Sequence, residues 1–230
     1  MEVEAVYVDR ERWEVPGIAE LVRRADEQGI VVYGLDATAV RSVSEATSPQ
    51  PILATARFAP RGLDELAVDG LVLVLHDVQD PGNAGTVIRS AEAAGARAVI
   101  LTGQSVDPYN PKTLRATTGA IFRVPVVVAD LTPTLDGLAR QHVRTLATVV
   151  REGDDVLATD LRAPTAILIG NEAAGLDDAV VARCDGRISI AMAGGESLNA
   201  GVAASLIAFV ARWQVEGRGG FGAPRSLGRS

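Results

Sequence analysis

The sequence predicts an α/β protein with a mostly parallel β-sheet covered by helices. Two observations carry this prediction. From Leu71 onward, short apolar or β-branched runs alternate with helix-like segments rich in alanine. Helix boundaries also carry their usual residues, since Gly95 can close one helix, and Thr132 with Pro133 can open another.

The individual elements follow from the same pattern. The expected strands are Leu71–His76, Ala98–Thr102, Val124–Val128, Thr145–Val150, Thr165–Ile169 and Arg187–Ile190. The expected helices are Ala84–Gly95, Pro111–Ala120, Thr132–Gln141, Asp177–Arg183 and a long last helix from Ser197 to about Val215.

Changes in composition divide the chain. Residues 1–60 form a smaller α/β unit, and residues 61–70, with acidic side chains and glycines, are expected to be a linker. Residues 71–216 form the main domain, and residues 217–230, rich in Gly, Arg and Ser, are expected to be a flexible tail. In the small unit the expected elements are strands at Val6–Val8, Ile30–Tyr33 and Ile52–Arg57 and a helix at Ile18–Gln28.

Composition excludes several classes of protein. A net charge of −7 and a pI of about 4.9 argue against a broadly basic nucleic-acid-binding surface, so any such site must be local. The single Cys184 and only two histidines suggest neither an internal disulfide nor a metal site. No apolar run approaches the roughly 20 residues of a membrane span, and the acidic N-terminus does not resemble a secretory signal, so a cytoplasmic location is expected.

The first chemistry-bearing segment is DVQDPGNAGTVIRSAEAAG, which follows the first strand of the main domain. Pro81 and Gly82 indicate a turn at the carboxyl end of that strand, where open α/β sheets bind their ligands. Asn83 is expected to cap the next helix, and Arg89 on that helix can face the same cleft. The segment is equally compatible with an ordinary capped helix that carries a solvated arginine, and its glycines lack dinucleotide-binding spacing.

Two later segments place further polar residues at strand ends. ILIGNEAAGL ends a strand in Gly170, Asn171 and Glu172, where the glycine allows a ligand to approach the backbone. ISIAMAGGESLNAGVAAS places Ser197 and Asn199 at the start of a small-residue helix, where amide donors favour an anionic group. Taken alone, such a helix is compatible with simple close packing.

Read in order, these three segments resemble the three motifs of the TrmH-type (SpoU) RNA ribose methyltransferases of the SPOUT superfamily. The resemblance covers about Leu71 to Val215, and NPKTLRATTGAIFRVP resembles the family's segment between its first two motifs. It implies a deep C-terminal trefoil knot, a homodimer, bound S-adenosyl-L-methionine, and methylation of a ribose 2′-hydroxyl. No metal and no membrane association are implied.

The resemblance also implies roles for particular residues. The implied catalytic residues are Asn83, Arg89, Glu172, Ser197 and Asn199. The implied cofactor contacts are Thr102, Gly103, Gly170, Asn171, Ile190, Met192, Ser197 and Leu198, and the implied RNA contacts are Arg89 and Arg115. The family assigns proton removal to the arginine that Arg89 matches. Because a guanidinium hardly deprotonates, Arg89 can instead orient the ribose and neutralise charge on its oxygen.

Two departures from the family pattern limit these implications. Ala191 replaces the proline that usually stands before the methionine of the third motif. Residues 1–60 resemble only the later half of the small RNA-recognition domain that some relatives carry. Ribosomal RNA is the favoured substrate; a tRNA ribose methyltransferase, a knotted RNA-binding paralogue without turnover, and an unrelated nucleotide-binding enzyme are the alternatives.

Overall fold

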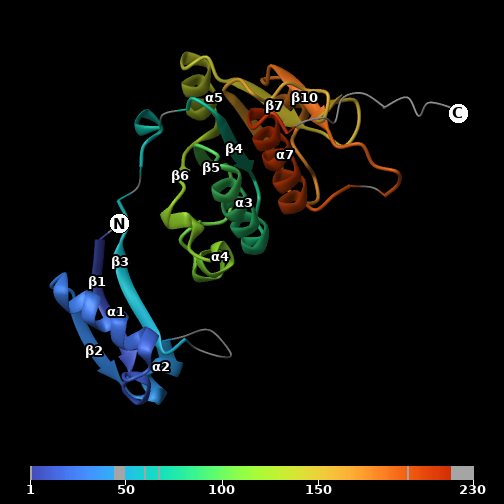
Figure 1. Ribbon diagram of the computed structural model, residues 1–230. Helices are drawn as coiled ribbons and strands as arrows, with labels where there is room; N and C mark the ends of the chain where they lie inside the picture. Colours follow the sequence, from blue (N-terminus) through green and yellow to red (C-terminus); the bar gives the residue numbers. More distant parts are fainter. Residues whose placement is uncertain (1, 44–49, 60, 67, 196, 219–230) are drawn as a thin grey trace, which may run out of the picture. The chain divides into compact units, whose positions relative to one another are not determined.

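Two compact units make up the protein, and they divide between Ala59 and Pro60. The computed structural model describes residues 2–43, 50–59, 61–66, 68–195 and 197–218 (Figure 1). Most of the tail expected at residues 217–230 lies outside the described residues.

A three-stranded sheet forms the first unit. Its elements are β1 (Glu2–Asp9), the 3-10 helix η1 (Arg10–Arg12), α1 (Pro16–Glu27), β2 (Val31–Leu35), α2 (Ala37–Val43) and β3 (Ile52–Arg57). β1 lies in the centre, parallel to β2 and antiparallel to β3. A small core of Val6, Val8, Ile18 and Ala25 joins α1 to one face of this sheet. The strands and α1 match the expected elements, whereas α2 was not expected.

The second unit contains the large sheet. Its elements are η2 (Leu63–Glu65), β4 (Leu71–His76), α3 (Pro81–Ala94), β5 (Ala98–Thr102), α4 (Pro111–Thr117), η3 (Ala120–Phe122), β6 (Val126–Val128), α5 (Leu131–Arg140), β7 (Arg144–Thr148), β8 (Asp154–Asp155), β9 (Thr165–Ile169), α6 (Asp178–Val181), β10 (Gly186–Ser189) and α7 (Ala200–Val215). The strand order is β6-β5-β4-β9-β7-β10-β8, and all neighbouring strands pair in parallel. The predicted α/β class with a mostly parallel sheet is therefore confirmed.

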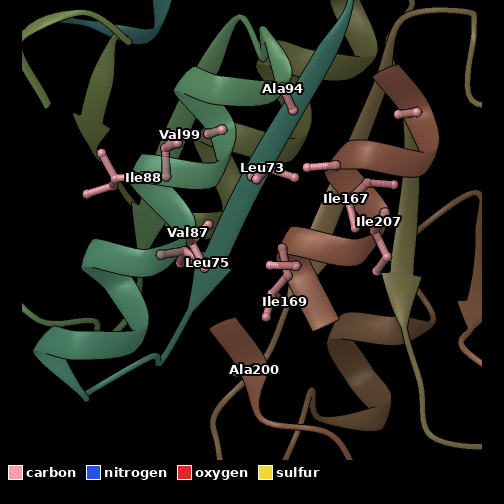
Figure 2. Close-up of a cluster of buried hydrophobic side chains, with 14 of the residues drawn as sticks. Leu73, Leu75, Val87, Ile88, Ala94, Val99, Ile167, Ile169, Ala200 and Ile207 are labelled. Atoms are coloured by element: carbon pink, nitrogen blue, oxygen red, sulfur yellow. The ribbon is translucent and has the colours of Figure 1, made fainter. Parts of the chain in front are cut away.

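Both faces of this sheet are buried, which explains the nearly continuous apolar character of its strands. Alternate residues of each strand point to opposite faces. Leu73 and Leu75 of β4 pack with Val87 and Ile88 of α3 and with Ile207 of α7, as Figure 2 shows. The intervening residues of β4 and β9 pack on the other face, against α5 and α6. The carboxyl ends of the parallel strands are thus held on a rigid frame.

The segment expected to be a linker is partly packed. Leu63–Glu65 forms the short helix η2, and Leu66 and Val68 are each only 6% exposed in the core beneath α5. Their apolar side chains gain more from burial against the sheet than from a solvated linker. The linker prediction for residues 61–70 rested on their acidic residues and glycines, and it gave no weight to the apolar residues that stand between them.

The fifth helix also begins earlier than expected. α5 starts at Leu131 with Asp130 at the N-cap position, so Thr132 is not the cap and Pro133 is the third helical residue. Proline is tolerated there because the first turn of a helix has no carbonyl partner for its N–H groups. The hydroxyl of Thr134 donates to the carbonyl of Asp130 at 2.8 Å, which stabilises this first turn.

Candidate active site

Asp80 fixes the start of α3 at the carboxyl end of β4. Its side chain accepts a hydrogen bond from the Asn83 N–H at 2.7 Å, and Pro81 occupies the first helical position. The prediction that Asn83 caps this helix is wrong, because an aspartate directly before a proline is the stronger start signal. The amide side chain of Asn83 therefore remains available for other contacts.

The turn after β9 folds tightly on itself. Asn171 and Gly175 exchange backbone hydrogen bonds of 3.0 and 2.9 Å. A Cβ atom at Gly170 would lie 2.3 Å from the backbone of Gly175, so only glycine fits there. The side chain of Asn171 accepts N–H bonds from Ala173 and Ala174 and donates to the carbonyl of Asp77 at 2.8 Å. Asn171 thereby ties this turn to the end of β4.

Glu172 connects the same turn to the N-terminus of α3. Its carboxylate accepts hydrogen bonds from the Asn83 amide at 3.0 Å and from the Asp80 and Gln79 N–H groups at 3.2 and 3.4 Å. Partial burial by itself would raise the pKa of Glu172. The hydrogen bonds from Asn83 and from the backbone outweigh burial, so the net pKa is below that of an ordinary glutamate.

Asn199 extends this network to the last helix. It donates to the side-chain oxygen of Asn83 at 2.9 Å and accepts from the Val202 N–H at 3.1 Å, so it is the N-cap of α7. The expectation that Ser197 begins this helix is wrong, since α7 starts at Ala200. Asn83, Glu172 and Asn199, which come from three distant motifs, are therefore linked side chain to side chain.

Beside this network lies a cleft with a volume of about 180 Å³. Six of the eight expected cofactor contacts line it: Gly170, Asn171, Ile190, Met192, Ser197 and Leu198. Thr148, Val149 and Val150 at the end of β7 form one wall of the cleft, although no motif in the sequence predicted them as site residues. The general rule that ligands bind at the carboxyl ends of parallel strands would have pointed to this third strand end.

Thr102 and Gly103 do not line this cleft. Thr102 is buried, and its hydroxyl lies 3.2 Å from the Leu75 carbonyl and 2.9 Å from His76 Nδ1. Gly103 has a φ of +64°, and a Cβ there would lie 2.2 Å from the carboxylate of Asp77. These residues close the β4 and β5 ends against each other, and β4 separates β5 from β9, the nearest strand whose end lines the cleft.

Arg89 and Arg115 are exposed on α3 and α4. Neither guanidinium group forms a hydrogen bond or ion pair with another described residue. Arg89 lies six residues beyond Asn83, which corresponds to about 9 Å along the helix axis. The structure thus leaves both guanidinium groups free to meet an anion, whereas it commits Asn83, Glu172 and Asn199 to one another.

Two further observations concern the described part of the chain. None of its helices is long and apolar enough to cross a bilayer. None of its His, Cys, Asp and Glu side chains assemble into a group of three or more that could hold a metal ion.

Comparisons with known proteins agree with this picture. Residues 70–209 match the model of the SpoU rRNA Methylase family. The 23S rRNA (guanosine(2553)-2′-O)-methyltransferase RlmP of Bacillus subtilis is 34% identical over 216 residues, which are 90% of this chain and 86% of that protein. The 23S rRNA (uridine(2479)-2′-O)-methyltransferase of Streptomyces viridochromogenes is 39% identical over 74% of this chain and 63% of that protein.

A solved structure gives the same relationship in three dimensions. The SpoU methyltransferase AviRb from Streptomyces viridochromogenes, in complex with the cofactor AdoMet, superimposes with a TM-score of 0.84 at 31% identity. The alignment covers 92% of this chain and 83% of that one.

Proposed function

The chain belongs to the SpoU rRNA methylase family, and from this membership and the cleft we propose that it methylates a ribose 2′-hydroxyl of ribosomal RNA with S-adenosyl-L-methionine as cofactor. One observation carries the proposal: the ends of β7, β9 and β10 and the start of α7 converge on a single cleft, beside a network that joins all three sequence motifs. From a reaction on ribosomal RNA we also infer that the protein acts in the cytoplasm.

The residues of the cleft fit this cofactor. Its walls are largely apolar, with Val149, Ile190, Leu198 and Ile207 suited to an adenine ring, and strand-end backbone at Gly170 offers hydrogen-bonding groups. We assign cofactor contacts to Gly170, Asn171, Ile190, Met192, Ser197 and Leu198, and leave Thr102 and Gly103 out. When bound, S-adenosyl-L-methionine supplies a methyl group activated by its positively charged sulfur.

Arg89 acts on the nucleotide that receives the methyl group. A ribose 2′-hydroxyl is a poor nucleophile at neutral pH, so charge that develops on its oxygen must be stabilised. Arg89 is exposed, and its guanidinium has no hydrogen-bond or ion-pair partner among the described residues. A guanidinium offers donors only and accepts no proton readily. It therefore contributes by orienting the ribose and by electrostatic stabilisation, with Arg115 as a phosphate contact.

Asn83, Glu172 and Asn199 act as positioning residues. The lowered pKa of Glu172 makes its carboxylate a weak base, and its two oxygens already accept from Asn83, Asp80 and Gln79. The network therefore holds α3, which carries Arg89, in register with the cleft. Among the implied catalytic residues, Glu172 and Ser197 both line the cleft, so Ser197 is a further side chain that can contact a ligand there directly.

A knotted path of the chain belongs to the same proposal. β10 lies between β7 and β8, although residues 149–153 alone connect those two strands. A Cβ atom at Gly153 would lie 2.7 Å from the backbone of Ile188, so the connecting loop presses closely on β10. A later segment that passes under an earlier loop in this way supports the trefoil knot implied by the family motifs.

We also infer that the protein is a homodimer through α7. Val202 and Leu206 lie four residues apart on α7 and are 46 and 43% exposed. They form an apolar stripe on the side of α7 opposite its buried residues, and Phe209 and Trp213 continue it. A second copy of the chain would cover this stripe. Light scattering should show a dimer for the wild type and a monomer for Leu206→Glu.

The reaction is tested by supplying labelled S-adenosyl-L-methionine with separate pools of deproteinised 23S rRNA, 16S rRNA and tRNA. We expect label in 23S rRNA at a single ribose, mapped by resistance of the adjacent phosphodiester to alkali. Label in tRNA alone would contradict the rRNA assignment. Label on a base in place of a ribose would contradict the reaction type.

A further inference from the structure

Arg89 faces the segment that runs from α4 to η3. Gly85 and Glu92 lie four residues before and three residues after it, on the same stripe of α3. A Cβ atom at Gly85 would lie 2.3 Å from that of Ala116, and Glu92 forms a 2.9 Å ion pair with Arg123. Because Gly85 and Glu92 both contact residues 112–123, the face of α3 that carries Arg89 is turned toward that segment.

An exposed aromatic ring lies in this segment. Phe122 is 56% exposed, whereas its neighbours Ile121 and Val124 are 5 and 4% exposed in the core. Among the described aromatic residues of the second unit it is the only exposed one, since Tyr109, Phe209 and Trp213 are half-buried. The protein thus anchors this stretch of chain through its neighbours, while more than half of the Phe122 side chain remains exposed.

The charge of this region differs from that of the whole protein. Residues 108–129 contain no Asp or Glu but carry Lys112, Arg115 and Arg123, in a chain whose net charge is −7. Lys112 and Arg115 are exposed and have no ion-pair partner among the described residues. Some other exposed arginines of this unit pair with carboxylates, among them Arg97 with Asp69 and Arg162 with Asp160. Unpaired cations on the same segment as an exposed ring complement a polyanion that carries aromatic bases.

We propose that Phe122 is a stacking platform for an unpaired RNA base close to the target nucleotide, with Lys112 and Arg115 on the neighbouring phosphates. This inference rests on the proposed function and adds the class of RNA element recognised. Phenylalanine offers a π-face without hydrogen-bonding groups, so the contact is sequence-tolerant. It requires a base released from its helix, and it therefore favours loops and bulges over continuous duplex.

Binding of deproteinised 23S rRNA, measured by filter retention at several salt concentrations, tests the proposal. Phe122→Ala should weaken binding about tenfold or more, because stacked bases lose this much on removal of the ring. The slope of affinity against salt should stay unchanged, and Phe122→Trp should restore affinity. Arg115→Gln should instead reduce the slope by about 0.7 to 0.9, the value of one phosphate contact. Leu157→Ala, which truncates another exposed apolar side chain near β8, should bind like the wild type.

Several results would overturn the proposal. Wild-type affinity in Phe122→Ala would do so, and so would full affinity in Phe122→Leu, since an apolar contact would then suffice without a π-face. A changed oligomeric state in Phe122→Ala would assign the ring to a protein interface. Cofactor affinity, measured by calorimetry, should be unchanged in all variants. If the wild type methylates rRNA and Phe122→Ala does so equally well, only this inference fails; if the wild type methylates no RNA, the proposed function itself fails, and this inference with it.

Discussion

The two units of this protein differ in how their sheets are buried. In the first unit, one face packs against α1 through four buried side chains, while Val31 and Tyr33 on the other face are 53 and 49% exposed. In the second unit, hydrophobic clusters cover both faces of a seven-stranded sheet. Only the second arrangement holds several strand ends firmly enough to bring distant polar side chains within hydrogen-bonding distance.

The distribution of chemistry follows this difference. The network of Asn83, Glu172 and Asn199 spans the β4, β9 and α7 ends of the second unit. In the first unit the prominent side-chain feature is the stacked pair Tyr7 and Tyr33, whose rings lie 5.4 Å apart. We therefore assign catalysis to the second unit, and a contribution to RNA binding is the role we propose for the first.

The largest effect is expected from Arg89→Ala. Loss of the proposed electrostatic stabilisation should reduce the rate of methyl transfer by about 100- to 1000-fold. Cofactor affinity measured by calorimetry should remain nearly intact, because Arg89 does not line the cleft. Arg140→Ala, on α5, removes an equally exposed cation and should keep full activity. An equal loss of activity and cofactor affinity would contradict the role of Arg89.

The next effect compares the two cores directly. Ile167→Ala should destabilise the second unit by about 2 to 5 kcal/mol, because Ile167 is fully buried within a sheet that cannot collapse around a cavity. Val8→Ala removes fewer atoms from a smaller core and should cost about 1 to 2 kcal/mol in the first unit. Trp13 and Trp213 allow each unit's denaturant unfolding to be followed by fluorescence in single-tryptophan variants. Equal shifts of both transitions in both variants would show that the units unfold together.

A smaller effect is expected from removal of residues 1–59. The second unit has its own core, so it should keep its cofactor affinity. The KM for rRNA should rise by about tenfold, the loss of roughly 1.4 kcal/mol of RNA binding. An unchanged KM would show that the first unit takes no part in recognition. Loss of cofactor binding would show that the two units are not independent.

The smallest effect concerns pH. The folded-state pKa of Glu172 is lowered, so its ionised form stabilises the fold at any pH above the ordinary glutamate value, near 4.3. This contribution is lost as the pH falls through the lower folded-state pKa. The stability difference between wild type and Glu172→Gln should therefore shrink on acidification from pH 6 to about pH 3. A difference that grows in acid would have the wrong sign for this network.

Much of the second unit could be predicted locally. The ranges of β4, β5 and β9 were correct because their apolar runs are bounded by clear turn residues. The strand β8 was missed because two residues are too few to show an alternating pattern. The β7 strand was predicted, but its end was not predicted as a wall of the cleft. The caps of α3 and α7 were each misplaced by a few residues, because several polar residues compete at both starts and only the observed backbone selects Asp80 and Asn199.

The sequence by itself determined the fold class, the positions of the buried strands and the three motifs, because each depends on residues that are near neighbours in the chain. Tertiary structure alone decided which side chains meet. It places Asn83 against Glu172 and Asn199, and it separates Thr102 on β5 from the cleft-lining strand β9 by β4. The physical reason is strand order: hydrogen bonds between residues 89 and 116 positions apart depend on which strands are neighbours, and no local pattern encodes that.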